Sequence, residues 1–171
     1  HYYDSLPYPC LAEERNDEQS IGAGLEGENS RPPMSKIQVS EAWLKDENGR
    51  VLMLRGVNLG GSSKVPLTSG ELTAASFYDH RHVSFVGRPF PLAEAGEHFT
   101  RLRRWGLTFL RLIVPWEAIE HAGPGQYDRD YLEYLLELAT IAHHHGLRMF
   151  IDPHQDAWSR LSGGDGAPGW T

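Results

Sequence analysis

A cluster of polar and aromatic side chains near the end of the sequence has the composition of a carbohydrate-binding site. Asp152, His154 and Asp156 come directly after the apolar segment 147–151, and Trp158 follows them. Carboxylate and imidazole groups bind sugar hydroxyls, whereas the face of an aromatic ring packs against the C–H side of a pyranose. These residues therefore predict a sugar site at the carboxyl end of a buried strand.

Further candidates lie outside that cluster. Arg111 lies in the apolar segment 108–114, where it is either a core arginine paired with a structural carboxylate or a member of the site. Lys64 is either a solvated loop lysine or a basic residue at the sugar, and Trp170 lies in a Gly-rich loop where stacking on substrate is expected. Three consecutive histidines at 143–145 would point in different directions on a helix, so no metal site is expected from them.

Apolar strands and amphipathic helices that alternate along the sequence are expected to position these side chains. The expected strands begin at Val51, Thr108 and Leu147, and the expected helices extend from Leu92 towards Gly106 and from Asp128 towards Gly146. Pro115 and Pro153 lack a backbone N–H, so we expect them to stop the second and third strands. Continuous apolar strands separated by helices predict a parallel sheet with right-handed crossovers.

A parallel α/β sheet of this kind is either a (β/α)8 TIM barrel or an open doubly wound sheet. The turn after the first strand, residues 58–62, lacks the G-x-G-x-x-G pattern that binds a dinucleotide. Long loops follow every strand, including an irregular connection expected at 61–91, and favour a barrel whose site lies at the C-terminal ends of its strands. Because such a barrel needs about 250 residues, we expect only its first three strands in this chain.

Two N-terminal features precede the expected barrel. Residues 1–35 are rich in acidic residues and lack apolar periodicity, so we expect a disordered acidic leader there. Further along, Asn48-Gly49 lies between two extended apolar runs and predicts an N-terminal β-hairpin. The chain begins with His1 rather than Met and stops at Thr171 directly after a Gly-rich loop, which indicates a fragment of a longer polypeptide.

Composition excludes several classes of partner. The 171 residues carry a net charge of -7, which argues against a nucleic-acid groove or an anionic membrane surface as the main partner. No apolar run approaches the roughly 20 residues that an integral membrane segment requires. The single cysteine, Cys10, rules out an internal disulfide and slightly favours a reducing, intracellular compartment.

Three motifs associated with the expected strands resemble glycoside hydrolase family 5, the retaining β-glycosidases built on a (β/α)8 barrel. The motifs are RGVNLGG at 55–61, LRL at 110–112 with Pro115-Trp116, and DPHQDAWS at 152–159. The last motif and SGGDGAPGW at 162–170 are most similar to the endoglycoceramidase-related branch, which includes glucosylceramidases and steryl β-glucosidases. The resemblance implies that residues 36–171 are the N-terminal part of a glycoside hydrolase catalytic domain.

The resemblance also implies a function. The full-length protein would cleave the β-glucosidic bond of a glycolipid, a steryl glucoside or glucosylceramide, with retention and without a cofactor. Its partner would be the glycolipid substrate, which it would reach by peripheral contact with a membrane. The alternative is a catalytically inactive, truncated fragment that at most binds carbohydrate weakly.

Roles for individual residues follow from the same resemblance. Arg111 would hold the nucleophilic carboxylate ionised and oriented, and His154, with Asp152 and Asp156, would bind the sugar next to the scissile bond. Lys64 would contact the same sugar. Both catalytic glutamates would follow the fourth and seventh strands and are expected outside this chain. We therefore assign neither role to the carboxylates expected near the strand ends, namely Glu117, Glu120, Asp152, Asp156 and Asp165.

Overall fold

The computed structural model describes residues 36–67 and 73–171, which fall into two compact units that divide after Val51. The expected leader at 1–35 lies outside the described residues. Elements occur in the order β1 (Gln38–Ser40), β2 (Trp43–Lys45), β3 (Gly56–Leu59), η1 (Gly61–Lys64), α1 (Ala74–Tyr78), α2 (Leu92–Arg104), β4 (Phe109–Pro115), α3 (Trp116–Glu120), α4 (Arg129–His144), β5 (Arg148–His154) and η2 (Arg160–Ser162).

The first unit contains two chain reversals, one at the predicted Asn48-Gly49 turn and one that the sequence did not predict. Strands β1 and β2 pair with Val39 opposite Leu44, and the chain reverses at Glu41, whose φ is +56°. The predicted Asn48-Gly49 turn comes after β2 and leads to a single bridge between Lys45 and Val51. The predicted turn is therefore present with only one bridge beyond it, whereas the paired strands β1 and β2 and their reversal at Glu41 were not predicted.

A side chain explains why the Asn48-Gly49 turn stays local. The Asp46 carboxylate accepts hydrogen bonds from the backbone N–H groups of Asn48 and Arg50, both at 2.9 Å. It also forms an ion pair with Nε of Arg50 at 2.7 Å. Aspartate commonly closes turns of this type by binding the backbone that follows it. These bonds hold the pKa of Asp46 below its usual value, the backbone N–H of Arg50 being the largest cause.

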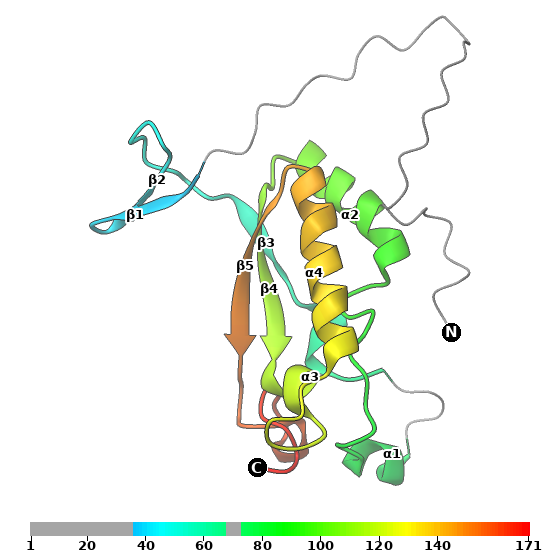
Figure 1. The fold of residues 1–171 in the computed structure, drawn as a ribbon. Helices are drawn as coiled ribbons and strands as arrows, with labels where there is room; N and C mark the ends of the chain where they lie inside the picture. Colours follow the sequence, from blue (N-terminus) through cyan, green and yellow to red (C-terminus); the bar gives the residue numbers. More distant parts are fainter. Residues whose placement is uncertain (1–35, 68–72) are drawn as a thin grey trace, which may run out of the picture. The chain divides into compact units, whose positions relative to one another are not determined.

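The second unit is built on a parallel sheet with the strand order β3-β4-β5. Gly56 lies opposite Phe109 and Arg111 opposite Phe150, so the three strands start in line. Strands β4 and β5 point towards the same end of the sheet, where α3 and the last residues of the chain also lie (Figure 1). The predicted parallel α/β arrangement is thus confirmed.

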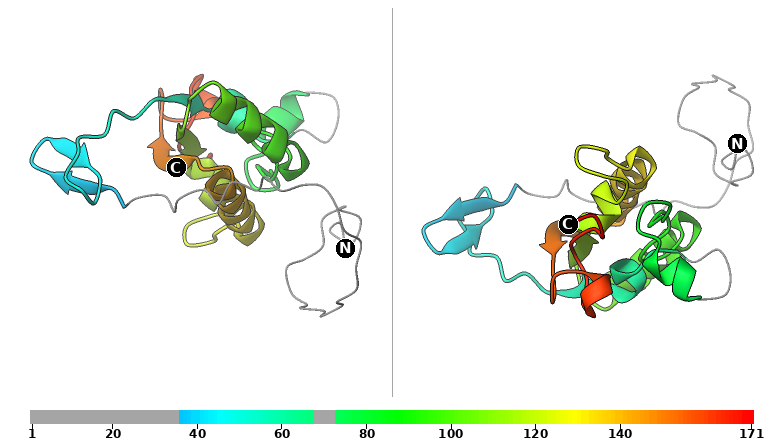
Figure 2. Two further views of the ribbon diagram at one scale, coloured as in Figure 1. Left: turned by 90° about the horizontal axis from the view of Figure 1, so that it is seen from above. Right: turned by 90° about the horizontal axis from the view of Figure 1, so that it is seen from below.

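Helices α2 and α4 form the second layer and lie along one side of the sheet (Figure 2). Along β4, Leu110, Leu112 and Val114 are buried in the apolar core. Because side chains alternate between the two faces of a strand, Arg111 lies on the face away from these helices. The helices contribute further core residues, which include Ala95, Phe99, Tyr131, Tyr134, Leu138 and Ala142.

Both long helices agree with their predicted limits. Asp128 caps α4 by accepting a hydrogen bond from the Tyr131 N–H at 2.9 Å. The chain leaves α2 and α4 through Gly106 and Gly146, whose φ values of +77° and +71° suit a residue without a Cβ. These signals are local in sequence, which is why the sequence predicts them well.

Three other expectations need correction. Strand β5 does not stop before Pro153 but continues to His154, and the register pairs Pro153 with Val114 and His154 with Pro115 of β4. A proline lacks only the N–H donor, so it can occupy a strand position whose N–H is not needed by the neighbouring strand. The loop expected after β4 contains the short helix α3. The connection expected to be irregular at 61–91 contains the helical turns η1 and α1.

Two glycines in the segment after Val51 permit close approaches to β4. A Cβ built on Gly56 would lie 1.6 Å from the carbonyl oxygen of Phe109, and one on Gly60 would lie 2.6 Å from Cδ1 of Ile113. The backbones of β3 and β4 therefore pair without room for a side chain at Gly56.

Candidate active site

Polar side chains from all three parallel strands meet towards the C-terminal edge of the sheet. Asn58 on β3 and Arg111 on β4 are direct partners in the register, and Nη1 of Arg111 donates to Oδ1 of Asn58 at 3.4 Å. Nη2 of Arg111 forms an ion pair with Oδ2 of Asp152 on β5 at 2.7 Å. Arg111 thus bridges its two neighbouring strands, at the edge from which α/β enzymes build their sites.

The carboxylate of Asp152 joins Arg111 to His154. Nδ1–H of His154 donates to Oδ2 of Asp152 at 3.0 Å, so the same oxygen binds both a guanidinium and an imidazole. Asp152 and His154 are each 17% exposed, whereas Arg111 is 39% exposed. The guanidinium is therefore fixed on one side and open to solvent on the other.

A second carboxylate, Asp165, extends this arrangement from β5 back to the segment after β3. Its Oδ2 lies 3.0 Å from Nζ of Lys64, and its Oδ1 lies 3.6 Å from Nε2 of His154. We use the term polar network for the six residues that these contacts connect, which are Asn58, Arg111, Asp152, His154, Asp165 and Lys64. Four of them were predicted as site residues; Asn58 and Asp165 were not.

The loop that carries Asp165 folds back onto the end of β5. Asp156 and Asp165 exchange two backbone hydrogen bonds, both of 2.8 Å, and form an isolated antiparallel bridge. A Cβ on Gly164 would lie 1.8 Å from the carbonyl oxygen of Asp156, so only glycine fits there. The side chain of Asp156 itself is exposed.

Trp158 occupies a strained position in the same loop. Ala157 and Trp158 both adopt positive φ values, +45° and +74°, which residues with a Cβ rarely do. The indole is 52% exposed, and its Nε1–H donates to Oγ1 of Thr171 at 3.0 Å. Since strain of this kind concentrates at functional sites, the geometry agrees with a presented aromatic surface.

Trp170 packs among aromatic neighbours instead of standing alone. Its ring lies edge-to-face with Trp116 at a centroid distance of 5.3 Å, and its Nε1–H donates to the Glu120 carbonyl at 2.7 Å. The indole N–H of Trp116 donates to the Glu120 carboxylate at 2.6 Å. That hydrogen bond, together with one from the Gly125 N–H, lowers the pKa of Glu120.

Several known proteins resemble this chain in sequence or in fold, although no family model matches it. The chain is 55% identical over 140 residues to a glucosylceramidase of Rhizopus delemar, covering 79% of this chain and 20% of that protein. Its fold matches sterylglucosidase 1 of Cryptococcus neoformans with a TM-score of 0.72 and 40% identity, over 80% of this chain and 19% of that structure. It also matches endo-glycoceramidase II of Rhodococcus sp. with a TM-score of 0.53 and 27% identity, over 75% of this chain and 25% of that structure.

Over most of its length, the chain is therefore similar to one part of glucosylceramidases, sterylglucosidases and endo-glycoceramidases, as its resemblance to glycoside hydrolase family 5 predicted. It spans about a fifth of the length of the curated glucosylceramidases that it matches. Five of the six residues of the polar network lie within the motifs that carry this resemblance, and Lys64 comes shortly after the first of these motifs.

A buried ion pair that the sequence did not predict holds several segments of the second unit together. Nε of Arg160 donates to both carboxylate oxygens of Glu117, at 2.8 and 3.0 Å, and the two side chains are 6% and 2% exposed. The guanidinium also donates to the carbonyl oxygens of Phe77 and Asp79. Burial raises the pKa of Glu117, and the nearby Arg160 charge partly offsets this effect.

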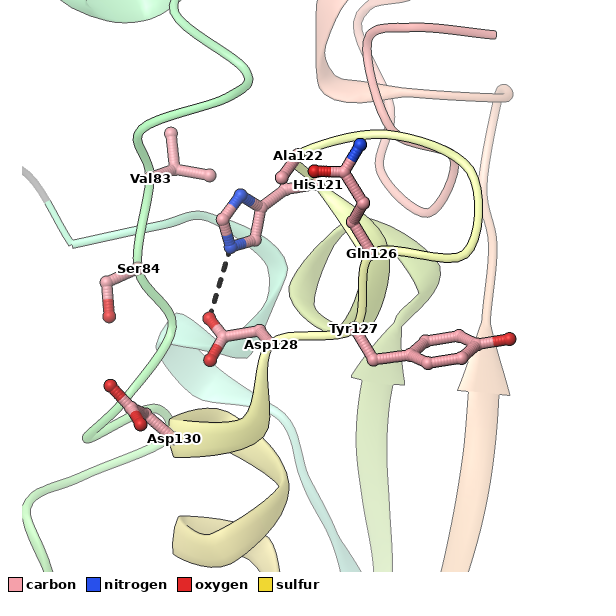
Figure 3. Close-up of a pocket in the computed structure, with 8 residues that line it drawn as sticks. All are labelled: Val83, Ser84, His121, Ala122, Gln126, Tyr127, Asp128 and Asp130. Atoms are coloured by element: carbon pink, nitrogen blue, oxygen red, sulfur yellow. Dashed lines mark hydrogen bonds and ion pairs between the residues drawn. The ribbon is translucent and has the colours of Figure 1, made fainter.

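The second unit has a pocket of about 430 Å³ apart from the polar network (Figure 3). Its lining residues are Val83, Ser84, His121, Ala122, Gln126, Tyr127, Asp128 and Asp130. Nε2 of His121 lies 3.1 Å from Oδ2 of Asp128, and its Nδ1 lies 2.9 Å from the Arg81 carbonyl oxygen. Because both ring nitrogens contact loop or cap atoms, His121 ties the 80–86 segment to the start of α4.

Within 36–67 and 73–171, no group of three or more His, Cys, Asp or Glu side chains is arranged to hold a metal ion. One of the three consecutive histidines, His145, contacts Oγ1 of Thr100 through Nδ1 at 3.2 Å. The described part of the chain also has no helix long and apolar enough to cross a membrane.

Proposed function

We propose that the full-length protein is a retaining O-glycosyl hydrolase that cleaves the β-glucosidic bond of a glycolipid, a steryl glucoside or glucosylceramide. The observation that carries this proposal is the convergence of Arg111 and His154 on one oxygen of Asp152, at the C-terminal edge of a parallel sheet. The names of the relatives, glucosylceramidase and sterylglucosidase, support the choice of a glucosylated lipid.

Arg111 acts on the nucleophile in this proposal. Its guanidinium is held by Asn58 and Asp152 and is partly open, so it has N–H groups left for a further carboxylate. Glycosidases that retain configuration need two carboxyl groups about 5–5.5 Å apart, one as nucleophile and one as acid and base. A positive charge beside the nucleophile keeps it ionised before attack.

The carboxylates described here are poor candidates for that catalytic pair. Glu117 is paired with Arg160, Asp152 with Arg111, and Asp165 with Lys64. Each of these groups already has a structural partner, whereas a nucleophile needs a free oxygen that faces the anomeric carbon. We infer that both catalytic glutamates come from further strands, which complete the sheet as a (β/α)8 barrel.

The sugar would lie over the ends of β3 and β5. Lys64 supplies a nitrogen donor, the exposed carboxylate of Asp156 accepts from hydroxyls, and Trp158 offers an apolar ring for the C–H face. His154 borders this space with its ring nitrogens turned towards Asp152 and Asp165. Trp170 contributes less freely, because its ring already packs on Trp116. The lipid part of the substrate would be reached by peripheral contact with a membrane.

A chimera tests this function directly. Residues 36–171 of this chain would replace the corresponding segment of the Rhizopus delemar glucosylceramidase, to which the chain is 55% identical. We expect the purified chimera to hydrolyse an aryl β-glucoside, and glucosylceramide or a steryl glucoside, with retention of configuration detected by NMR. A folded chimera that releases no glucose from any of these substrates would favour the alternative, an inactive segment that only binds carbohydrate.

A further inference from the structure

Asp165, which had no assigned role, lies between the two basic groups that follow β3 and end β5. Its side chain is 4% exposed, with one oxygen 3.0 Å from the Lys64 ammonium and the other 3.6 Å from Nε2 of His154. Burial of a carboxylate is unfavourable unless charges or hydrogen bonds compensate for the lost hydration. Here the compensation comes from two groups on separate strand ends, so the carboxylate links them.

The backbone fixes this carboxylate before any ligand arrives. The paired hydrogen bonds between Asp156 and Asp165 close the loop, and the N–H of Ala167 donates to the Trp158 carbonyl at 2.7 Å. Gly164 lies against the Asp156 carbonyl too closely for any other residue. The position of the Asp165 side chain is therefore set by the fold and not by the sugar.

His154 is oriented from both sides. Its Nδ1–H donates to Asp152, and its Nε2 faces Oδ1 of Asp165. In the described part of the chain, Nε2 of His154 and Oδ1 of Asp165 are both buried and have no hydrogen-bond partner. Because Nδ1–H is directed at Asp152, Nε2 can donate to Oδ1 only in the imidazolium form, in which both ring nitrogens carry a hydrogen, and the two atoms are then a small movement away from a hydrogen bond.

We propose that Asp165 is a positioning residue that orients the Lys64 ammonium towards the bound sugar and holds the His154 imidazole in place beside it. An ammonium group has three N–H donors, so one directed at Asp165 leaves others for sugar hydroxyls. Groups that orient a metal-ligating histidine typically change activity or affinity about 10–100-fold when they are removed, and we expect a comparable effect for a group that orients a sugar-binding side chain. This inference rests on the proposed function, because it takes a sugar as the ligand of the site.

The test uses Asp165→Asn in the chimera, which removes the charge and keeps the size of the side chain. We expect kcat/KM on an aryl β-glucoside to fall about 10–100-fold while the melting temperature stays close to that of the parent. Lys64→Met should cause a similar loss, and the double variant should lose much less than the product of the two. Asp130→Asn, an exposed aspartate on α4, is the matched control and should leave kcat/KM unchanged.

The proposal would be overturned if the loss of kcat/KM in the double variant equalled the product of the losses in Asp165→Asn and Lys64→Met. It would also be overturned if Asp165→Asn kept the parent's activity per folded molecule. A second measurement does not depend on catalysis. The ring nitrogens of His154, assigned by comparison with His154→Asn after 15N-histidine labelling, should shift in Asp165→Asn and not in Asp130→Asn. If the chimera proves inactive, the proposed function fails, yet unchanged His154 resonances would still count against Asp165 and shifted ones would support it.

Discussion

Arg111 and Asp152 form a 2.7 Å ion pair although they are not opposite each other in the sheet. The register places Arg111 opposite Phe150, and Asp152 opposite Ile113. The guanidinium therefore reaches two residues further along β5, towards the C-terminal edge where the strands end. The backbone of Arg111 thus lies in the middle of a strand, but its guanidinium lies near the C-terminal edge of the sheet, at the candidate site.

Loss of either Arg111 or His154 should impair catalysis and leave the fold intact. Removing a preorganised group that acts on the transition state typically costs about 10²–10³ in kcat. We expect Arg111→Ala and His154→Ala to lower kcat/KM of the chimera on an aryl β-glucoside by that amount. Steady-state kinetics and thermal melts of the same preparations would measure both effects.

His144→Ala is the control for these variants, because His144 is exposed on α4. It should leave both activity and melting temperature nearly unchanged. A sharp fall in melting temperature for Arg111→Ala or His154→Ala, with activity per folded molecule preserved, would show that these residues are structural and that the site assignment is wrong.

The buried Glu117 carboxyl should give the protein a measurable dependence of stability on pH. Because burial raises its pKa in the folded state, the folded protein holds this proton more tightly than the unfolded chain does. The free energy of unfolding should therefore be highest below the ordinary glutamate pKa and fall as pH rises through the raised value. Urea unfolding of the chimera and of Glu117→Gln across this range should show the fall only in the parent.

The comparison between parent and Glu117→Gln isolates this one group from the other carboxylates. An equal slope in the two proteins would mean that the Arg160 charge cancels the effect of burial. A steeper slope in Glu117→Gln would contradict the direction of the pKa shift.

Gly56→Ala should prevent β3 from pairing with β4. The new Cβ would lie 1.6 Å from the Phe109 carbonyl oxygen, a backbone atom that cannot move aside without breaking the sheet. We expect the chimera with this change to be largely insoluble or to unfold at a much lower temperature. Gly96→Ala on α2 is the matched control, since its Cβ would meet only ordinary contact at 3.7 Å and should stabilise the helix by about 0.5–1 kcal/mol.

Trp158→Gly separates the strain at this position from its function. Its positive φ costs a residue with a Cβ roughly 1–3 kcal/mol, which glycine does not incur. We expect the melting temperature to hold or rise, while KM for an aryl β-glucoside increases because the exposed ring is lost. An unchanged KM would show that the indole does not contact the substrate. Gly163→Ala is the converse control for stability: it adds a Cβ at a positive φ without any steric contact, and it should lower the melting temperature.

Local sequence signals predicted the framework of the second unit well. The periodicity of α2 and α4, the Asp128 cap and the glycines after each helix depend on neighbours within a few residues. The end of β5 was predicted too early, because the cost of a proline depends on which strand edges are paired. That information lies in the tertiary arrangement and not in the segment itself.

The candidate site was only partly predictable for the same reason. Arg111, Asp152 and His154 could be proposed because they interrupt or follow apolar strands. The Lys64–Asp165 pair depends on a loop that folds back through a backbone bridge, which no spacing of residue types reveals. The glycines on both sides of Asp165 were the one visible sign of a tight backbone approach.

The alternation of side chains along β5 has a consequence for how this chain is compared with its relatives. Asp152 and His154 lie two residues apart on the face that bears the site. A single-residue deletion before Asp152 would exchange the faces, so that Pro153 and Gln155 would replace them. Relatives can therefore differ in length in the loops after the strands and still share this site. A relative with a one-residue gap within Arg148–His154 cannot share it.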